Sequence, residues 1–337
     1  MPVVSRFRLA LLLTVAAGAV VALHVQDAGG GHDKPAPVRQ ETTVAMVARP
    51  TPAPAVPVTL AHPAATGSSA PASALRTAQD FCVLAAHRLP NVTLSLCEQD
   101  QLVDSGSRSV LGRPLWQRDV VARNARRRVL VIGGIHGDEL SASALALHWI
   151  KDASDAPDGI HWRFVPLMNP DGALRQPPTR VNAHGVDLNR NFPTPGWSVD
   201  APRYWTQRTR RDPRRYPGPR ALSEPETQWL VQEMARWKPD LIVSIHAPYG
   251  LLDFDGPTVP PQRLGRLYLD QLGIYPGSLG NYGGVHNKVP VVTIELQSAL
   301  RTPLDPEMRQ MWLDLLHWID ERVRVPDTVA VHDKAVS

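Results

Sequence analysis

Two histidines and one glutamate stand beside apolar runs that are typical of buried strands. His136 and Glu139 follow the run 129–135 at a His-x-x-Glu spacing, and His246 follows the run 241–245. Active sites of open α/β sheets lie beyond the carboxyl ends of the strands, so these side chains should meet there. Two imidazoles and one carboxylate with an open fourth position are typical of a catalytic zinc site. The set predicts one zinc ion, although His246 alone also fits a hydrogen-bonded histidine of the core.

Glu295 is the only acid in the apolar run 291–296. A buried carboxylate without a partner is costly, so the position predicts a partner in the interior. A water molecule at a metal ion is such a partner, and Glu295 would then act as a general base. The alternative is a structural arginine that neutralises the carboxylate.

The stretch from Arg180 to Pro193, RVNAHGVDLNRNFP, is rich in hydrogen-bond donors. A guanidinium group binds a carboxylate through two parallel hydrogen bonds, and two arginines of this stretch offer such groups. The stretch therefore predicts recognition of a carboxylate.

Strands and helices that would position these residues alternate along the chain. Apolar, β-branched runs predict buried strands at 129–135, 162–167, 241–245 and 291–296. Apolar residues at helical spacing follow at 140–150, 230–237 and 308–319. This order is typical of an α/β domain with a mixed or mostly parallel sheet.

The first residues have the pattern of an export signal. Arg6 and Arg8 precede an uncharged apolar run from Leu9 to Leu23, which is typical of a signal peptide. The run is short for a membrane-spanning helix, and an uncleaved N-terminal anchor is the alternative for residues 1–26. Residues 27–73 are rich in Pro and Ala and predict a disordered tether. Residues 326–337 are assigned to a C-terminal tail.

The two cysteines, Cys82 and Cys97, lie in a small segment at 74–104. Apolar spacing predicts a helix that ends before Pro90, and the alternation of Val92, Leu94 and Leu96 then predicts a strand. An even pair of cysteines in an exported chain favours a disulfide, which would join this helix to this strand. Two unpaired buried thiols are the alternative.

The composition excludes several classes of protein. With 337 residues, 43% hydrophobic and 20% charged, the chain can bury a sizeable core, so it is not wholly disordered, collagenous or held by disulfides alone. The formal charge of +4 gives no reason to expect nucleic-acid binding.

Six motifs occur in one order along the chain. They are His136-x-x-Glu139, Asn169 to Gly172, Arg180 to Pro193, Ser223 to Thr227, Ser244 to His246 and Thr293 to Leu296. Together they resemble the carboxypeptidase A-like zinc peptidases over roughly residues 105–323. The residues around His246 and the short connection to Glu295 are most similar to the bacterial murein peptide amidase A branch, whose members cut the γ-D-glutamyl-diaminopimelate bond.

The resemblance implies a three-layer α/β/α sandwich with a mixed, mostly parallel central sheet, and a catalytic domain at 105–325. It also implies that His136, Glu139 and His246 hold zinc and that Glu295 is the general base and then the acid. Arg180 would stabilise the oxyanion.

The resemblance further implies that Asn189 and Arg190 bind the free carboxylate of the terminal residue, so that cleavage occurs at a chain end. Many relatives cap the substrate with a tyrosine. Tyr275 is the candidate for this role in the present chain, and Tyr282 is the rival.

A diaminopimelate leaving residue would bring an ammonium and a second carboxylate at its far end, and both charges need partners. Asp253 and Asp255 follow His246 and are candidates for the ammonium, unless they only cap a turn around two nearby glycines. The segment Arg203 to Arg220 has seven arginines and one acid. It offers bases for the carboxylate, and the alternative is a solvated surface loop.

These residues predict an exported zinc metallopeptidase, in a bacterial periplasm or anchored facing it, that hydrolyses the C-terminal amide bond of a peptidoglycan-derived peptide. An aspartoacylase-like or succinylglutamate desuccinylase-like deacylase and a broader carboxypeptidase are the alternative enzymes. A wall-binding module without activity is a third class. We expect no nucleic-acid partner, and membrane contact only through an uncleaved N-terminus.

Overall fold

The computed structural model of the chain describes residues 76–155 and 159–323. The predicted signal peptide or anchor, the tether and the C-terminal tail lie outside these residues. Among the described helices, none combines the length and the apolar composition that crossing a membrane requires.

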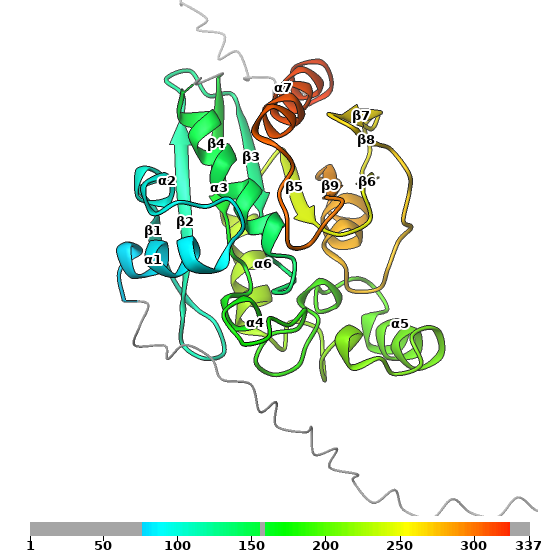
Figure 1. Cartoon of the computed structure of the whole chain (residues 1–337). Coiled ribbons are helices and arrows are strands. Elements are labelled where there is room, and N and C mark those ends of the chain that lie inside the picture. Colours follow the sequence, from blue (N-terminus) through cyan, green and yellow to red (C-terminus); the bar gives the residue numbers. More distant parts are fainter. Residues whose placement is uncertain (1–75, 156–158, 324–337) are drawn as a thin grey trace, which may run out of the picture. The chain divides into compact units, whose positions relative to one another are not determined.

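A mixed seven-stranded sheet organises the described residues (Figure 1). In spatial order the strands are β1 (Val103–Arg108), β2 (Pro114–Val121), β4 (Ile160–Val165), β3 (Arg127–Ile132), β5 (Leu241–His246), β9 (Val291–Glu295) and β6 (Leu251–Asp255). The four central strands, β4, β3, β5 and β9, are parallel, and β2 and β6 pair with them antiparallel on either side. These four are the strands that the apolar runs predict, because strands buried on both faces are apolar throughout.

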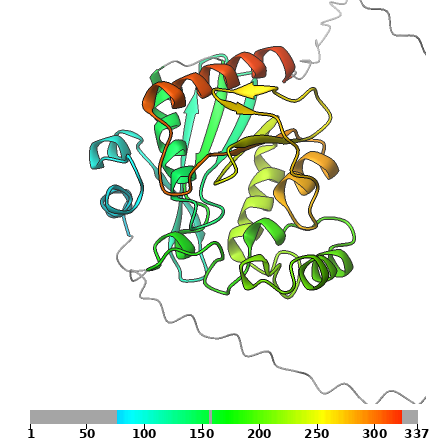
Figure 2. The same cartoon turned by 45° about the vertical axis from the view of Figure 1, so that its right-hand side comes forward.

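Helices cover both faces of the sheet (Figure 2). The α-helices of the described residues are α1 (Ala78–Arg88), α2 (Leu94–Gln99), α3 (Leu140–Asp155), α4 (Pro170–Ala173), α5 (Trp197–Arg203), α6 (Pro225–Trp237) and α7 (Asp305–Arg322). The helices α3 and α7 cover one face and α6 covers the other. Val129 and Val131 of β3 pack into the core shared with α3 and α7, whereas Leu130 and Ile132 pack into the core shared with α6. Successive side chains of a strand point to opposite faces. The predicted three-layer α/β/α sandwich is therefore confirmed.

The segment that holds the cysteines differs from the sequence-based prediction. Residues Leu94–Gln99 form the helix α2 rather than a strand, and the side chain of Thr93 caps it by accepting a hydrogen bond from Leu96 N. The alternating residues mark no buried face, since Val92 is buried but Leu94 is 38% exposed. The Cys82–Cys97 disulfide thus joins two helices, α1 and α2, which pack on the same core as α3 and α7.

A long irregular segment connects β4 to α6 and runs past the carboxyl ends of the central strands. Besides α4 and α5, its short turns are Leu188–Arg190, Tyr204–Arg208 and Pro213–Arg215. After β6 the chain forms the small hairpin β7 (Arg263–Leu264) and β8 (Leu267–Tyr268), and then a turn at Asn281–His286. Residues of the irregular segment, and residues 272–280 between the hairpin and the turn, line the predicted site, whereas the hairpin packs beside α7.

Candidate active site

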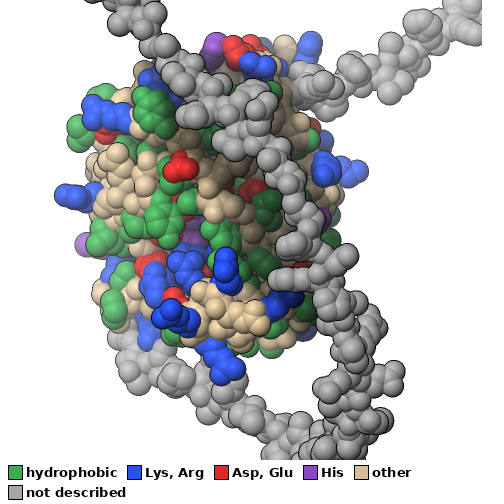
Figure 3. Space-filling model, turned by 90° about the vertical axis from the view of Figure 1, so that its right-hand side faces the viewer, with side chains coloured by type: hydrophobic (Ala, Val, Ile, Leu, Met, Phe, Trp, Pro, Cys, Tyr) green, Lys and Arg blue, Asp and Glu red, His purple; other side chains and the backbone are tan. Residues whose placement is uncertain are grey.

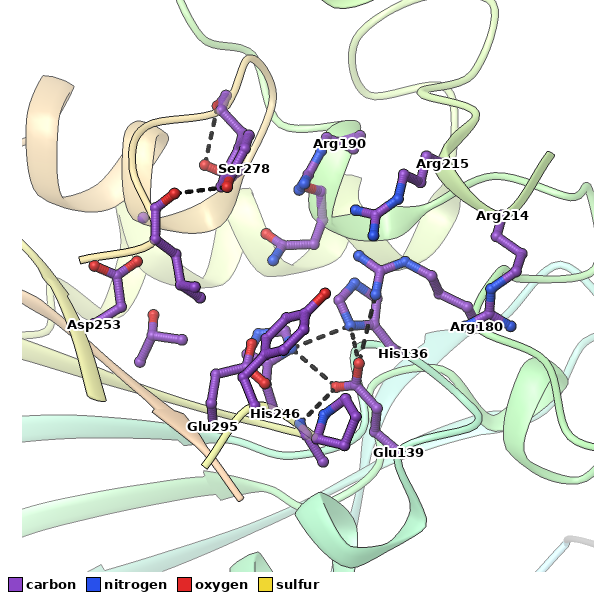
Figure 4. Close-up of a pocket in the computed structure, with 18 of the residues that line it drawn as sticks. His136, Glu139, Arg180, Arg190, Arg214, Arg215, His246, Asp253, Ser278 and Glu295 are labelled. Atoms are coloured by element: carbon purple, nitrogen blue, oxygen red, sulfur yellow. Dashed lines mark hydrogen bonds and ion pairs between the residues drawn. The ribbon is translucent and has the colours of Figure 1, made fainter. Parts of the chain in front are cut away.

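His136, Glu139 and His246 meet at the carboxyl ends of β3 and β5 (Figure 4). His136 Nδ1 lies 2.8 Å from Glu139 Oε1, and His246 Nδ1 lies 3.0 Å from Glu139 Oε2. The two Nδ1 atoms are 3.1 Å apart. One donor atom from each residue lies within 4.8 Å of the others, and all three residues are buried. This arrangement could hold a metal ion.

The surroundings of these three residues fit zinc. The other nitrogen of each imidazole contacts an oxygen atom. His136 Nε2 lies 3.2 Å from Asp187 Oδ1, and His246 Nε2 lies 2.9 Å from Ser244 Oγ. Such contacts orient histidine ligands in metal sites. Burial opposes ionisation of Glu139, but the two histidines outweigh it and hold its pKa well below the usual range. The carboxylate is thus ionised and ready to bind a cation.

Glu295 is placed beside these residues by the pairing of β5 with β9. In this parallel register His246 and Glu295 are partners at the ends of their strands. Within the described part of the chain, Glu295 Oε2 is buried and accepts no hydrogen bond. Burial, together with the charge of Glu139, raises the pKa of Glu295. The structure therefore leaves one carboxylate oxygen of Glu295 available for another group.

Arg180, which lies in the irregular segment, also has its side chain beside the metal-binding residues. Its Nε donates to Asp187 Oδ2 at 3.0 Å, and its Nη1 lies 3.5 Å from Glu139 Oε1. Asp187 thus contacts both Arg180 and His136. The sequence-based prediction missed this residue, and the only signal was a single acid in a stretch of donors. Despite complete burial, Arg180 and His136 hold the pKa of Asp187 well below its usual range.

Asn189 and Arg190 lie on a 3₁₀ turn next to Tyr275. Asn189 Oδ1 accepts a hydrogen bond from Leu279 N at 2.8 Å, which leaves the amide nitrogen for a ligand. Arg190 is 5% exposed, its Nε has no acceptor among the described residues, and its guanidinium lies 4.6 Å from the centre of the Tyr275 ring. Tyr275 lines the cavity, whereas Tyr282 packs on a buried phenylalanine and is not among the lining residues.

A cavity of about 560 Å³ is lined by the three metal-binding residues together with Glu295, Arg180, Asn189, Arg190 and Tyr275. Asp253 and Asp255 line it from β6, where they lie within the strand rather than in a turn. Burial raises the pKa of Asp253, and burial together with Asp253 raises the pKa of Asp255 to about 6. No ion pair of either carboxylate is found in the described residues. The β6 side of the cavity is therefore acidic.

Arginines of the segment Arg203 to Arg220 also line the cavity. These are Arg208, Arg214 and Arg215, with Tyr204 beside them. Figure 3 displays one face of the molecule, and Lys and Arg side chains gather on the lower part of that face. The composition shows that the segment is basic, but it could not show which arginines line the cavity, because no periodic pattern runs through the segment.

The chain is similar to a known protein family and to individual known proteins. A family model described as zinc carboxypeptidase matches residues 98–252. Murein peptide amidase A of Vibrio campbellii is 32% identical over 199 residues, which cover 57% of this chain and 78% of that protein. Murein peptide amidase A of Escherichia coli K12 is 37% identical over 149 residues, or 43% of this chain. The match spans 59% of the length of the E. coli protein.

Among solved structures, murein-tripeptide amidase MpaA of Escherichia coli O157 matches with 30% identity and a TM-score of 0.45. The match covers 63% of this chain and 90% of that one. The resemblance predicted from the sequence motifs is confirmed by the family model and by the identity to the Vibrio protein. This chain belongs to the zinc carboxypeptidase family.

Proposed function

We propose that this chain is an exported, zinc-dependent amidase that hydrolyses the γ-D-glutamyl-diaminopimelate bond of murein peptides. One observation carries the proposal: a single cavity combines the His136, Glu139 and His246 group, a carboxylate with a free oxygen, and separate acidic and basic walls. The names of the similar proteins, murein peptide amidase A, support the choice of substrate.

One zinc ion per chain would be held by His136, Glu139 and His246. When bound, zinc supplies Lewis-acid polarisation of the scissile carbonyl and of a water molecule. Glu295 takes the proton of the attacking water on its free oxygen and returns it to the leaving amine. Arg180, fixed by Asp187, donates hydrogen bonds to the oxygen on which negative charge develops.

Asn189 and Arg190 bind the α-carboxylate of the leaving residue. The buried guanidinium has a nitrogen without an acceptor in the described residues, and a carboxylate would satisfy it. The ring of Tyr275 covers this guanidinium and closes the same side of the cavity. A ligand site for a chain-terminal carboxylate restricts cleavage to the last bond of the peptide.

Asp253 and Asp255 bind the ammonium at the far end of diaminopimelate. Two carboxylates without an ion pair among the described residues lie side by side in a cavity that has arginines elsewhere. A cation relieves their repulsion, which is the cause of the raised pKa of Asp255 after burial itself. A leaving residue with an apolar side chain would leave these charges without a partner.

We infer export to a bacterial periplasm, and the apolar run Leu9 to Leu23 behind two arginines supports this inference. The disulfide between α1 and α2 supports an oxidising compartment. Retention of residues 1–26 would anchor the chain to the membrane, facing the periplasm. Intact-mass measurement of the protein from the periplasmic fraction distinguishes the two forms.

Mass spectrometry of the zinc-loaded protein with three substrates tests the proposal. We expect release of diaminopimelate from L-Ala-γ-D-Glu-meso-diaminopimelate, and much slower cleavage of an ordinary peptide with an apolar C-terminus. Faster cleavage of the ordinary peptide would indicate a broader carboxypeptidase. Turnover of an N-acyl amino acid alone would indicate a deacylase, and no turnover with no bound zinc would indicate a wall-binding module.

A further inference from the structure

The arginine wall, defined here as Arg208, Arg214 and Arg215, has no role in the reaction derived above. All three side chains line the cavity that contains the metal-binding group. In Figure 4, Arg214 lies on the opposite side of this group from Asp253, and Arg215 lies between Arg214 and Arg190. The wall therefore faces a part of the substrate that the acidic β6 side does not reach.

The order of the strands explains this separation. The sheet runs β3, β5, β9, β6 across the site, so Asp253 on β6 lies at one edge. Arg214 Nη1 is 2.8 Å from Asp138 Oδ2, in the turn that follows β3. Arg214 and Asp253 are thus separated by the width of the metal-binding group, whereas Arg215 lies beside Arg190 and its charge acts on that guanidinium.

The direction of the substrate follows from the site for its terminal carboxylate. Asn189 is hydrogen-bonded to Leu279 N, and Gly280 beside it approaches Asp255 of β6 closely. The leaving residue consequently occupies the β6 side. Because the scissile bond lies at the metal-binding group, the acyl part of the substrate extends toward β3 and the arginine wall.

Arg215 has the free donors that a ligand on this side requires. Its Nε lies 3.7 Å from Asp212 Oδ2, and its two terminal nitrogens contact no partner in residues 76–155 and 159–323. The side chain is 34% exposed, so solvent reaches it, and it lines the cavity. Arg208 likewise has no ion pair in these residues, and Arg214 is already paired with Asp138.

A γ-linked glutamyl residue presents a negative charge where these donors lie. Its side-chain carboxyl forms the scissile amide, so its α-carboxylate stays free on the acyl side, a few bonds from the reacting carbon. An α-linked residue uses that carboxyl in the peptide bond and has no such charge. We propose that Arg215, supported by Arg208 and Arg214, binds this free carboxylate and selects γ-linked substrates. The proposal rests on the proposed function.

Two peptides that differ in one group test this role. One is L-Ala-γ-D-Glu-meso-diaminopimelate, and the other carries a carboxamide in place of the free glutamyl carboxylate. We expect Arg215→Gln to lower kcat/KM for the acid about tenfold, since a charged hydrogen bond at a partly exposed site is lost. The same variant should leave kcat/KM for the amide unchanged. Arg203→Gln, in the same segment but outside the cavity, should change neither value.

Equal losses on both peptides, or a wild-type protein that does not distinguish them, would overturn the proposal. Calorimetric binding of both peptides to the Glu295→Gln variant gives a readout without turnover. Tighter binding of the acid that disappears when Arg215→Gln is added supports the role of Arg215 even if the wild-type protein cleaves neither peptide, in which case the proposed reaction alone fails. Equal binding of the two peptides would reject the role itself.

Discussion

The metal-binding group and the arginine wall lie in one cavity but are built in different ways. His246 and Glu295 are the last residues of two paired parallel strands, and His136 follows a third. The arginines instead come from short turns between α5 and α6, joined mainly by local hydrogen bonds. The sheet fixes the reacting atoms, whereas irregular segments supply the groups that distinguish substrates.

The largest effect is expected where the strand ends supply the chemistry. Glu295→Gln should keep its zinc and lose about 10²–10⁴-fold in kcat, since proton transfer is lost while the metal ligands stay intact. His246→Ala should lose both zinc and activity, and chelation of the wild-type protein should do the same reversibly. Metal analysis beside steady-state kinetics checks each variant. An active Glu295→Gln protein would remove this residue from the mechanism.

Arg180 belongs to the irregular segment, but its side chain contacts Glu139 of the metal-binding group and Asp187. We expect Arg180→Gln to lower kcat about 10²–10³-fold with a smaller change in KM, as removal of an oxyanion donor does. Zinc content should be retained. A variant that loses its zinc would show instead that Arg180 acts by holding Glu139 and Asp187 in place.

The acidic wall should affect substrate choice more than the reaction itself. We expect Asp253→Ala or Asp255→Ala to lower kcat/KM for the diaminopimelate peptide by one to two powers of ten, about 1.4–2.7 kcal/mol. A peptide with an apolar terminal residue should be affected much less, because it has no ammonium to bind. Parallel kinetics with the two peptides measure this difference. Equal losses on both would reject a role in specificity.

The smallest expected effect concerns the attachment of the irregular stretch 180–193 to the helix α6. Glu226 of α6 is fully buried, and it accepts hydrogen bonds from Val110 N and Asn182 Nδ2. Burial raises its pKa to about 8, from an ordinary value of 4.5. The folded state therefore binds this proton more tightly than the unfolded state, so the free energy of unfolding falls as the pH rises from about 5 to 8.

Glu226→Gln cannot lose a proton, so its Tm should fall less than that of the wild type between pH 6 and 8.5, by roughly 3 °C. Asp100→Asn is a matched control, because burial also raises the pKa of Asp100 to about 8, but at the end of α2. Hydrogen exchange should show alkaline loosening of 180–193 in wild type and in Asp100→Asn only. Identical exchange in all three proteins would contradict this link.

The predictable parts of the fold are those that one periodicity determines. The central strands and the helices α3 and α7 could be found because burial imposes apolar runs or stripes on them. The strands β1, β2 and β6 could not, since β1 is almost entirely polar and polar residues interrupt the other two, as Asp253 does between Leu252 and Phe254 of β6. The helix α2 was mistaken for a strand because six residues are too few to separate the two periods.

The residues of the site likewise divide into those that could be predicted from the sequence and those that could not. His136, Glu139, His246 and Glu295 follow or end predicted strands, so topology alone brings them together. The inward direction of Arg215, or the double contact of Asp187, depends on turns whose paths are set by tertiary packing. Local sequence does not encode those paths.

The distance along the chain between the metal-binding residues has a consequence for folding. His136 and His246 are 110 positions apart, and they approach only when β3 and β5 have paired in register. Contacts of such long separation form slowly. A chain that has collapsed but not completed this pairing lacks the set of donors, so tight zinc uptake during refolding would report the finished central sheet rather than the presence of its residues.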